Sequence, residues 1–176
     1  EPIKGEAGIF IPDEGYLAEL RRICTEKGIL LIMDEIQTGF ARTGKMFCFQ
    51  HENAKPDILC VGKALGGGLY PVSASLSSRE IMSVFTPGSH GSTFGGNPLA
   101  AAIGDASLDV LVGEKLADRS RDMGAYFLKG LKGIKSKKIK AIRAKGLLLG
   151  VEFRLGPGET VRPICERLMK KGVLAK

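Results

Sequence analysis

The chain has 176 residues, 44% of them apolar, and a formal net charge of +7 from 26 basic and 19 acidic side chains. That length is enough for one sizeable core, and the apolar share excludes a disordered chain. No apolar run reaches the roughly 18 residues that a membrane-spanning helix needs. The first six residues lack a starting Met and the basic region of a signal peptide, so we expect the middle of a longer protein.

The excess of positive charge is local. Between Lys129 and Lys145 the chain carries basic side chains and no acidic one. No aromatic residue is interleaved with them, so we do not expect nucleic-acid binding. A solvated helix end and an edge strand protected by lysines explain this segment better.

The four cysteines form no CxxC pair, which indicates reduced thiols in a cytoplasmic protein, or in the mitochondrial matrix if the source is eukaryotic. Cys48 and His51 lie close in sequence, but no second Cys/His pair follows at zinc-site spacing. We therefore expect no metal site.

The first half of the chain alternates between strands and helices. Residues 7–11 predict a short strand. A helix is predicted from Pro12 to about Lys27, because apolar residues recur at helical spacing; these residues are Leu17, Leu20, Ile23 and Cys24. Gly28 is a plausible stop. Further strands are predicted at 29–33, 58–61 and 72–76, with a short helix at 45–53.

The second half begins with two long helices. Asn97 is predicted to cap a helix that runs to about Val112, and a second helix spans about 113–131 with Leu116, Met123 and Phe127 on one face. Two strands at 139–144 and 147–153, joined at Lys145-Gly146, and a helix at 160–171 follow. This order predicts an α/β unit followed by a smaller α+β portion, with a boundary between about 113 and 136.

Two chemically active side chains follow two of the predicted strands. Asp34 ends the strand at 29–33, and Lys63 follows the strand at 58–61. In open α/β sheets, ligands bind at the carboxyl edge of the strands. A carboxylate that stays ionised and a lysine that can form a Schiff base are the two groups that a pyridoxal phosphate enzyme needs. Burial at a strand end would favour the uncharged, nucleophilic amine of Lys63.

The same segments resemble a known family. Residues 33–44, MDEIQTGFARTG, look like the signature of the class III (ω-) aminotransferases, and residues 56–68, PDILCVGKALGGG, look like their Schiff-base lysine segment. The separation between Asp34 and Lys63 also fits. The runs at 68–74, 90–98 and 172–176 look most like the branch of the family whose amino donor is L-ornithine.

The resemblance implies a fold type I pyridoxal phosphate transferase. Residues 1–125 would then be the C-terminal part of the cofactor-binding large domain, and residues 126–176 the start of the C-terminal small domain. The family's upstream phosphate-binding segment and ring-stacking aromatic would precede Glu1, and its carboxylate-binding arginine would follow Lys176.

The resemblance also implies roles for individual residues. Lys63 would hold pyridoxal 5'-phosphate as a Schiff base and then move the substrate proton, while Asp34 would keep the ring nitrogen protonated. Gln37 would lie near the phenolic oxygen and Ile36 on one ring face.

Three further residues lie outside those two segments. Ser92 and Thr93 would serve the cofactor phosphate of the neighbouring subunit, which makes the expected assembly at least a homodimer. Glu6 would be a substrate-side residue, since the matching glutamate in the ornithine branch pairs with an active-site arginine and acts as a gate.

The function implied is transfer of the δ-amino group of L-ornithine to 2-oxoglutarate. The alternatives left open are a transaminase for N-acetylornithine or another ω-amino acid and, in another class, a non-catalytic chain that only folds or associates. Neither a nucleic acid nor a membrane is expected as a partner.

Overall fold

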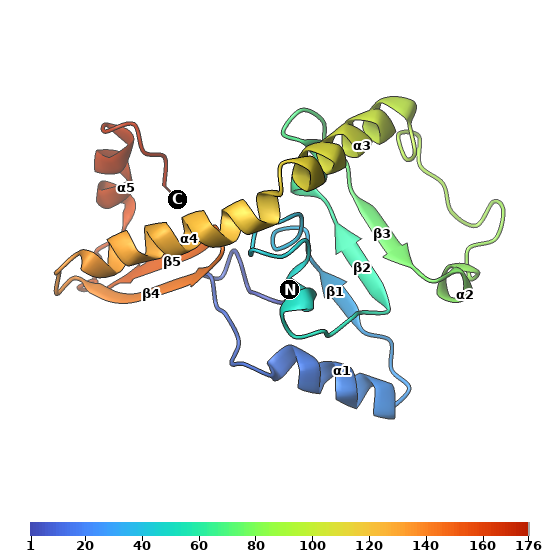
Figure 1. Ribbon diagram of the computed structural model, residues 1–176, viewed down its shortest axis with the longest axis horizontal. Helices are drawn as coiled ribbons and strands as arrows, with labels where there is room; N and C mark the ends of the chain where they lie inside the picture. The colour runs from blue at the N-terminus through green and yellow to red at the C-terminus, as the bar shows by residue number, and fades with distance from the viewer. Residues whose placement is uncertain (176) are drawn as a thin grey trace.

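The computed structural model describes residues 1–175, which form two sheets joined by long helices (Figure 1). The first sheet has the order β1-β2-β3, with β1 at Ile32–Asp34, β2 at Ile58–Val61 and β3 at Ala74–Ser77. β1 and β2 run parallel, and β3 runs antiparallel to β2. The second sheet is an antiparallel hairpin of β4 (Ile139–Lys145) and β5 (Leu148–Phe153).

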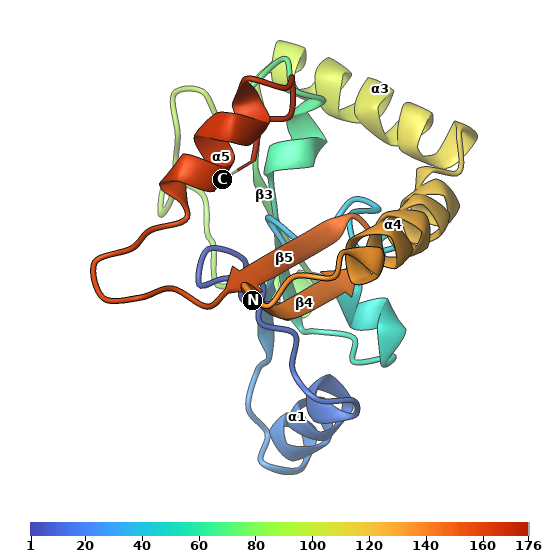
Figure 2. The same ribbon diagram turned by 90° about the vertical axis from the view of Figure 1, so that its left-hand side faces the viewer.

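The helices connect and cover these sheets. They are α1 (Tyr16–Glu26), α2 (Arg79–Met82), α3 (Pro98–Gly113), α4 (Leu116–Gly133) and α5 (Arg162–Met169), with 3-10 helices η1 (Cys48–His51) and η2 (Lys63–Gly66). α3 packs on η2, and α4 packs on β4 and β5 (Figures 1 and 2). No helix within residues 1–175 is long and apolar enough to cross a membrane.

The core lies between the first sheet and the segments around it. Leu17 and Cys24 of α1, Met33 of β1, and Leu59 and Val61 of β2 are all buried in one cluster. Burial of such side chains stabilises the fold by about 1.5–3 kcal/mol each. The core therefore fixes the two parallel strands whose ends carry the predicted chemistry.

β1 begins three residues later than the sequence predicts. The amide of Ile29 donates to Cys24 O (2.8 Å), which closes the end of α1, and Gly28 has a φ of 63° in the same turn. The amide of Leu31 donates to the Asp57 carboxylate at 2.7 Å. Because these amides are already engaged, the ladder with β2 starts at Ile32.

The strand predicted at residues 7–11 is wrong. The segment is a turn, closed by an isolated antiparallel bridge between Lys4 and Phe10. Gly8 and Ile9 have φ values of 112° and 55°, in the left-handed region that a strand does not use. α1 also begins later than predicted, because Gly15 before it has a φ of 87°.

The face of α4 that packs on the hairpin is not the one that carries the predicted apolar residues. Met123 and Phe127 are 46% and 50% exposed, while Ser120 and Gly124 are buried. The Ser120 hydroxyl donates to Arg42 O (2.9 Å) and accepts from the amide of Leu147 (3.2 Å). Small residues line this face because α4 lies directly against the hairpin turn.

Other expectations are confirmed. β2 has the predicted bounds, the β4–β5 hairpin turns after Lys145, and Asn97 caps α3 by accepting from the amide of Ala100 at 2.9 Å. The helices predicted at 45–53 and 160–171 occur in shorter form, as η1 and α5. The predicted domain boundary at residue 125 lies inside α4 and stays a prediction. Lys176 of the closing motif lies outside the described residues.

The basic segment after residue 129 covers the end of α4 and strand β4. Within it, Lys140 and Arg143 both pair with Glu152 of β5. These hydrogen bonds, Lys140 first, lower the pKa of the Glu152 carboxyl. Part of the local positive charge is therefore already balanced within the hairpin.

Candidate active site

The parallel pairing of β1 and β2 brings Asp34 and Lys63 to one edge of the first sheet. Asp34 pairs in register with Cys60, and the next amide, that of Glu35, donates to Cys60 O at 2.9 Å. β2 ends at Val61, and Lys63 opens η2 two residues later. Both strands therefore deliver their reactive group at the same carboxyl edge, where ligands bind in open α/β sheets.

Asp34 is half-buried, and one of its oxygens is fixed. Its Oδ1 accepts a hydrogen bond from the amide of Ile36 at 2.9 Å. Within residues 1–175, Oδ2 accepts no hydrogen bond. The turn thus orients the carboxylate and leaves one oxygen available to accept from a ligand.

Lys63 is exposed in this chain and lies on the turn that follows the end of β2 at Val61, with a φ of 45°. Activation of its amine by burial stays a prediction. Among the described residues its Nζ has no hydrogen-bond or ion-pair partner. The left-handed backbone, uncommon for a residue other than glycine, marks a constrained position.

Ile36 lies next to the residue that precedes Lys63. A β-carbon on Gly62 would stand 3.6 Å from two atoms of the Ile36 side chain and 3.4 Å from Cβ of Ser73. Gly62 is buried between these side chains. The structure therefore brings Ile36 to the edge that carries Asp34 and Lys63, and its packing on a cofactor ring stays a prediction.

Gln37 and Glu6 are brought together directly. Gln37 Nε2 donates to Glu6 Oε1 at 3.0 Å, although the two residues lie 31 positions apart. Gly5 permits the approach, because a β-carbon there would stand 2.4 Å from Gln37 Oε1. Two residues that the sequence assigned to the cofactor and the substrate thus form one hydrogen-bonded pair.

Ser92 and Thr93 are not brought to this group. Both are exposed on the segment between α2 and α3, which extends away from the carboxyl ends of β1 and β2 (Figure 1). There the Ser92 hydroxyl accepts from the amide of Gly95 at 3.0 Å. A role within this copy of the site is therefore not supported, and their predicted role in a neighbouring subunit stays a prediction.

The sequence analysis assigned no role to Glu35. The buried carboxylate of this residue binds the backbone of the loop at residues 48–49 next to the candidate site. Its side chain is 0% exposed and accepts from the amides of Cys48 (2.6 Å) and Phe49 (2.8 Å) and from the Thr38 hydroxyl (2.9 Å). Burial raises the pKa of this carboxyl, against the effect of those hydrogen bonds. The signal was available: strand alternation turns the residue after Asp34 to the opposite face.

Cys48 and His51 have other partners than a metal. Burial raises the pKa of the Cys48 thiol to about 12. His51 Nε2 lies 3.1 Å from Thr43 O and 3.2 Å from Thr43 Oγ1, and burial lowers its pKa. No group of three or more potential ligands that could hold a metal ion occurs within residues 1–175.

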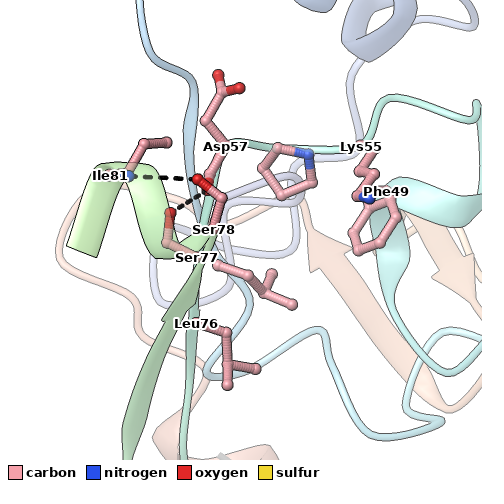
Figure 3. Close-up of a pocket in the computed structure, with 9 residues that line it drawn as sticks. Phe49, Lys55, Asp57, Leu76, Ser77, Ser78 and Ile81 are labelled. Carbon is pink, nitrogen blue, oxygen red and sulfur yellow. Dashed lines mark hydrogen bonds between the residues drawn. The ribbon is translucent and has the colours of Figure 1, made fainter. Parts of the chain in front are cut away.

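A pocket of about 570 Å³ lies elsewhere, at the amino end of β2 (Figure 3). Asp57 and Ser77 line it, and the Ser77 hydroxyl donates to Asp57 O at 2.7 Å. The Asp57 carboxylate is occupied by Arg21 (2.6 Å) and the amide of Leu31. Because the reactive groups lie at the opposite end of the strand, we place the candidate active site at the carboxyl edge.

The groups at that edge suit pyridoxal phosphate. The amine of Lys63 can condense with an aldehyde, and the available Asp34 oxygen can accept from a protonated ring nitrogen. The apolar Ile36 and the amide of Gln37 lie beside them. These residues therefore have the chemistry needed to hold the reactive end and the ring nitrogen of such a cofactor.

Known proteins are similar to this chain over its whole length. The family described as aminotransferase class-III matches residues 1–176. An ornithine aminotransferase of Oceanobacillus iheyensis is 57% identical over 176 residues, which is 100% of this chain and 43% of that protein. The chain thus spans less than half of that relative.

Two solved structures show the same fold. An ornithine aminotransferase from Plasmodium yoelii has a TM-score of 0.94 and 45% identity, covering 99% of this chain and 47% of that one. An acetylornithine aminotransferase from Elizabethkingia anophelis has a TM-score of 0.96 and 47% identity, covering 99% of this chain and 44% of that one. The expected fold class is therefore confirmed.

Proposed function

Because the chain belongs to the class-III aminotransferases, with the fold type I architecture of that family, we propose that the whole protein is an ornithine aminotransferase. It would transfer the δ-amino group of L-ornithine to 2-oxoglutarate. The observation that carries the proposal is the placement of Asp34 and Lys63 at the ends of neighbouring parallel strands. The 57% identity to an ornithine aminotransferase supports the choice of substrate.

Each residue at the edge has a distinct task in this proposal. Bound pyridoxal phosphate supplies an aldehyde that condenses with amines and a ring that accepts electrons. The Nζ of Lys63 would hold the cofactor and, as a free amine, would carry the proton to and from the reacting carbon. Oδ2 of Asp34 accepts from the ring N–H and keeps that proton in place. Ile36 excludes water from one ring face, and Gln37 orients the phenolic oxygen.

A homodimer is part of the proposal. Ser92 and Thr93 are exposed on the segment between α2 and α3, where their hydroxyls would serve the cofactor phosphate of a second subunit. A cytoplasmic location is proposed with it, from the four free thiols. Sedimentation across a concentration series tests the assembly: a monomer that binds the cofactor tightly would remove Thr93 from the site.

A second substrate has support. The acetylornithine aminotransferase structure is as similar to this chain as the ornithine enzyme is, so N-acetylornithine is the competing amino donor. The deciding experiment compares kcat/KM of the whole enzyme for L-ornithine and N-acetylornithine. We expect a preference for ornithine, and a preference for the acetylated donor would overturn our choice while leaving the transaminase chemistry intact.

A further inference from the structure

The turn that carries Glu6 has a strained backbone. Lys4 and Phe10 exchange two backbone hydrogen bonds, of 3.1 and 3.0 Å, and the chain reverses between them. Within the reversal, Gly8 has a φ of 112° and Ile9 a φ of 55°. A β-branched residue is an outlier at positive φ, so this conformation must be held by its surroundings.

Arg143 of β4 stabilises this strained conformation. Its Nε donates to Ile9 O and its Nη2 to Gly8 O, both at 3.0 Å. Its guanidinium carbon also lies 4.7 Å from the centre of the Phe10 ring. Two N–H groups of one rigid guanidinium thus bind the carbonyls of the two strained residues. The Phe10 ring lies against the same cation.

Two residues of β5 complete the arrangement. Glu152 accepts from Arg143 Nη1 at 2.6 Å and so fixes the guanidinium. Gly150 leaves room for the turn, because a β-carbon there would stand 3.1 Å from Ile9 Cβ and 3.3 Å from Gly8 O. In Figures 1 and 2 the dark blue N-terminal segment accordingly lies beside the hairpin.

The other side of the turn faces the candidate active site. Glu6 precedes the two clamped residues, and its Oε1 accepts from Gln37 Nε2 at 3.0 Å. Gln37 follows Asp34 by one short turn. The position of the turn therefore sets the position of the Glu6 carboxylate relative to the groups that would hold cofactor and substrate.

We propose that Arg143 is a positioning residue that holds the Glu6 carboxylate in place and thereby sets the choice of amino donor. The inference rests on the proposed function. Under that function Glu6 is the gate glutamate that pairs with an active-site arginine. While Glu6 is held in that pair, the arginine is not available to the second carboxylate of a dicarboxylic amino acid, so displacing Glu6 favours such a donor over a diamino acid. L-ornithine and L-glutamate differ in this respect.

The test uses Arg143→Gln in the whole enzyme, with two comparisons. Arg143→Lys keeps the charge but cannot donate to two carbonyls in the fixed geometry of a guanidinium. Arg154→Gln is the matched control, since Arg154 also donates to backbone carbonyls, Lys137 O at 3.1 Å and Ile139 O at 3.0 Å, but not to the Glu6 turn.

Two quantities are measured for each variant. Hydrogen exchange of the amides of residues 8–10, without cofactor, reports on the turn itself. The ratio of kcat/KM for L-ornithine to that for L-glutamate reports on selection. We expect Arg143→Gln and Arg143→Lys to speed exchange and lower the ratio, by up to roughly 100-fold for a displacement of about 1 Å. Arg154→Gln should change neither.

Several results would overturn the inference. They are unchanged exchange in Arg143→Gln, faster exchange with an unchanged ratio, or an equal fall of the ratio in Arg154→Gln. If Arg143→Gln does not fold, Gly150→Ala displaces the same turn with Arg143 intact and must lower the ratio. If the wild-type enzyme does not use ornithine, the proposed function fails and this selection fails with it, while the exchange data still report whether Arg143 holds the turn.

Discussion

Gly124 of α4 lies so close to Gly146 of the hairpin turn that a β-carbon on Gly124 would stand 2.1 Å from the Gly146 carbonyl oxygen. Gly146 in turn lies against the signature segment, where its own β-carbon would stand 2.5 Å from the carbonyl carbon of Thr43. Three pieces of backbone from distant parts of the chain thus meet without side chains between them. The Ser120 hydroxyl joins the same three segments by donating to Arg42 O and accepting from the amide of Leu147.

Gly124→Ala should therefore destabilise the protein by about 1–3 kcal/mol or more, because a backbone atom cannot move aside as a side chain can. Gly130→Ala is the matched control on the same helix, since nothing lies within 4 Å of the added carbon. It should be neutral or stabilise by up to about 1 kcal/mol, from helix propensity alone. Denaturant midpoints of the whole enzyme measure both. Equal effects of the two changes would contradict the close contact.

Lys63→Ala should abolish turnover and covalent attachment of the cofactor. Within residues 1–175, Lys63 is the lysine that directly follows β1 or β2 at their carboxyl edge. Borohydride reduction of the wild-type holoenzyme followed by peptide mass analysis should find the adduct on Lys63. An adduct on a neighbouring lysine, such as Lys55, would remove the central assignment.

Asp34→Ala should retain the covalently bound cofactor but lose roughly 10²–10³ in kcat, because an electrostatic partner of the ring nitrogen is removed. The visible spectrum of the bound cofactor and steady-state rates on ornithine measure the two effects separately. Turnover close to that of the wild type would show that Asp34 does not hold the ring proton.

Glu35→Gln should weaken the fold by about 1–3 kcal/mol, because its amide group would meet the N–H donors of Cys48 and Phe49. It should also change the pH dependence. The pKa of Glu35 is raised above 4.5 in the folded state, so the native protein binds the proton more readily than the unfolded chain. The free energy of unfolding therefore falls as pH rises from about 4.5 to the folded-state pKa, and is level above it.

Removing this ionisable group should flatten that part of the stability curve. Denaturant midpoints between pH 4 and 8 measure it, with Glu14→Gln, on an exposed side chain, as the control. A curve of unchanged slope in Glu35→Gln would show that another group titrates there.

Sequence patterns predicted the parts of the fold that local chemistry determines. The cap at Asn97, the bounds of strand β2 and the hairpin turn after Lys145 are each marked by a local sequence signal. The strand predicted at residues 7–11 failed because Arg143, far along the chain, stabilises a turn there instead. The face by which α4 meets the hairpin carries the small residues Ser120 and Gly124, because it lies against Gly146, and the apolar pattern of the helix does not indicate this face.

The candidate site divides in the same way. Asp34, Ile36 and Lys63 could be assigned from two motifs, because parallel strands bring their ends together. The pairing of Gln37 with Glu6 depends on a turn that is distant in sequence, and no spacing in the sequence indicates it. The burial of Glu35 follows from strand alternation after Asp34, but its partners, the amides of Cys48 and Phe49, come from a loop that the pattern does not place.

The clamp on the Glu6 turn also has a consequence for the order in which the protein is made. Ile9 and Arg143 are 134 residues apart, so the turn leaves the ribosome long before the strand that holds it. At about 5–20 residues per second, that interval is roughly 7–27 seconds of synthesis. During that interval the N-terminal segment can form the bridge between Lys4 and Phe10, but the guanidinium of Arg143 is absent. The Glu6 carboxylate therefore reaches its final position only when the β4–β5 sheet has formed.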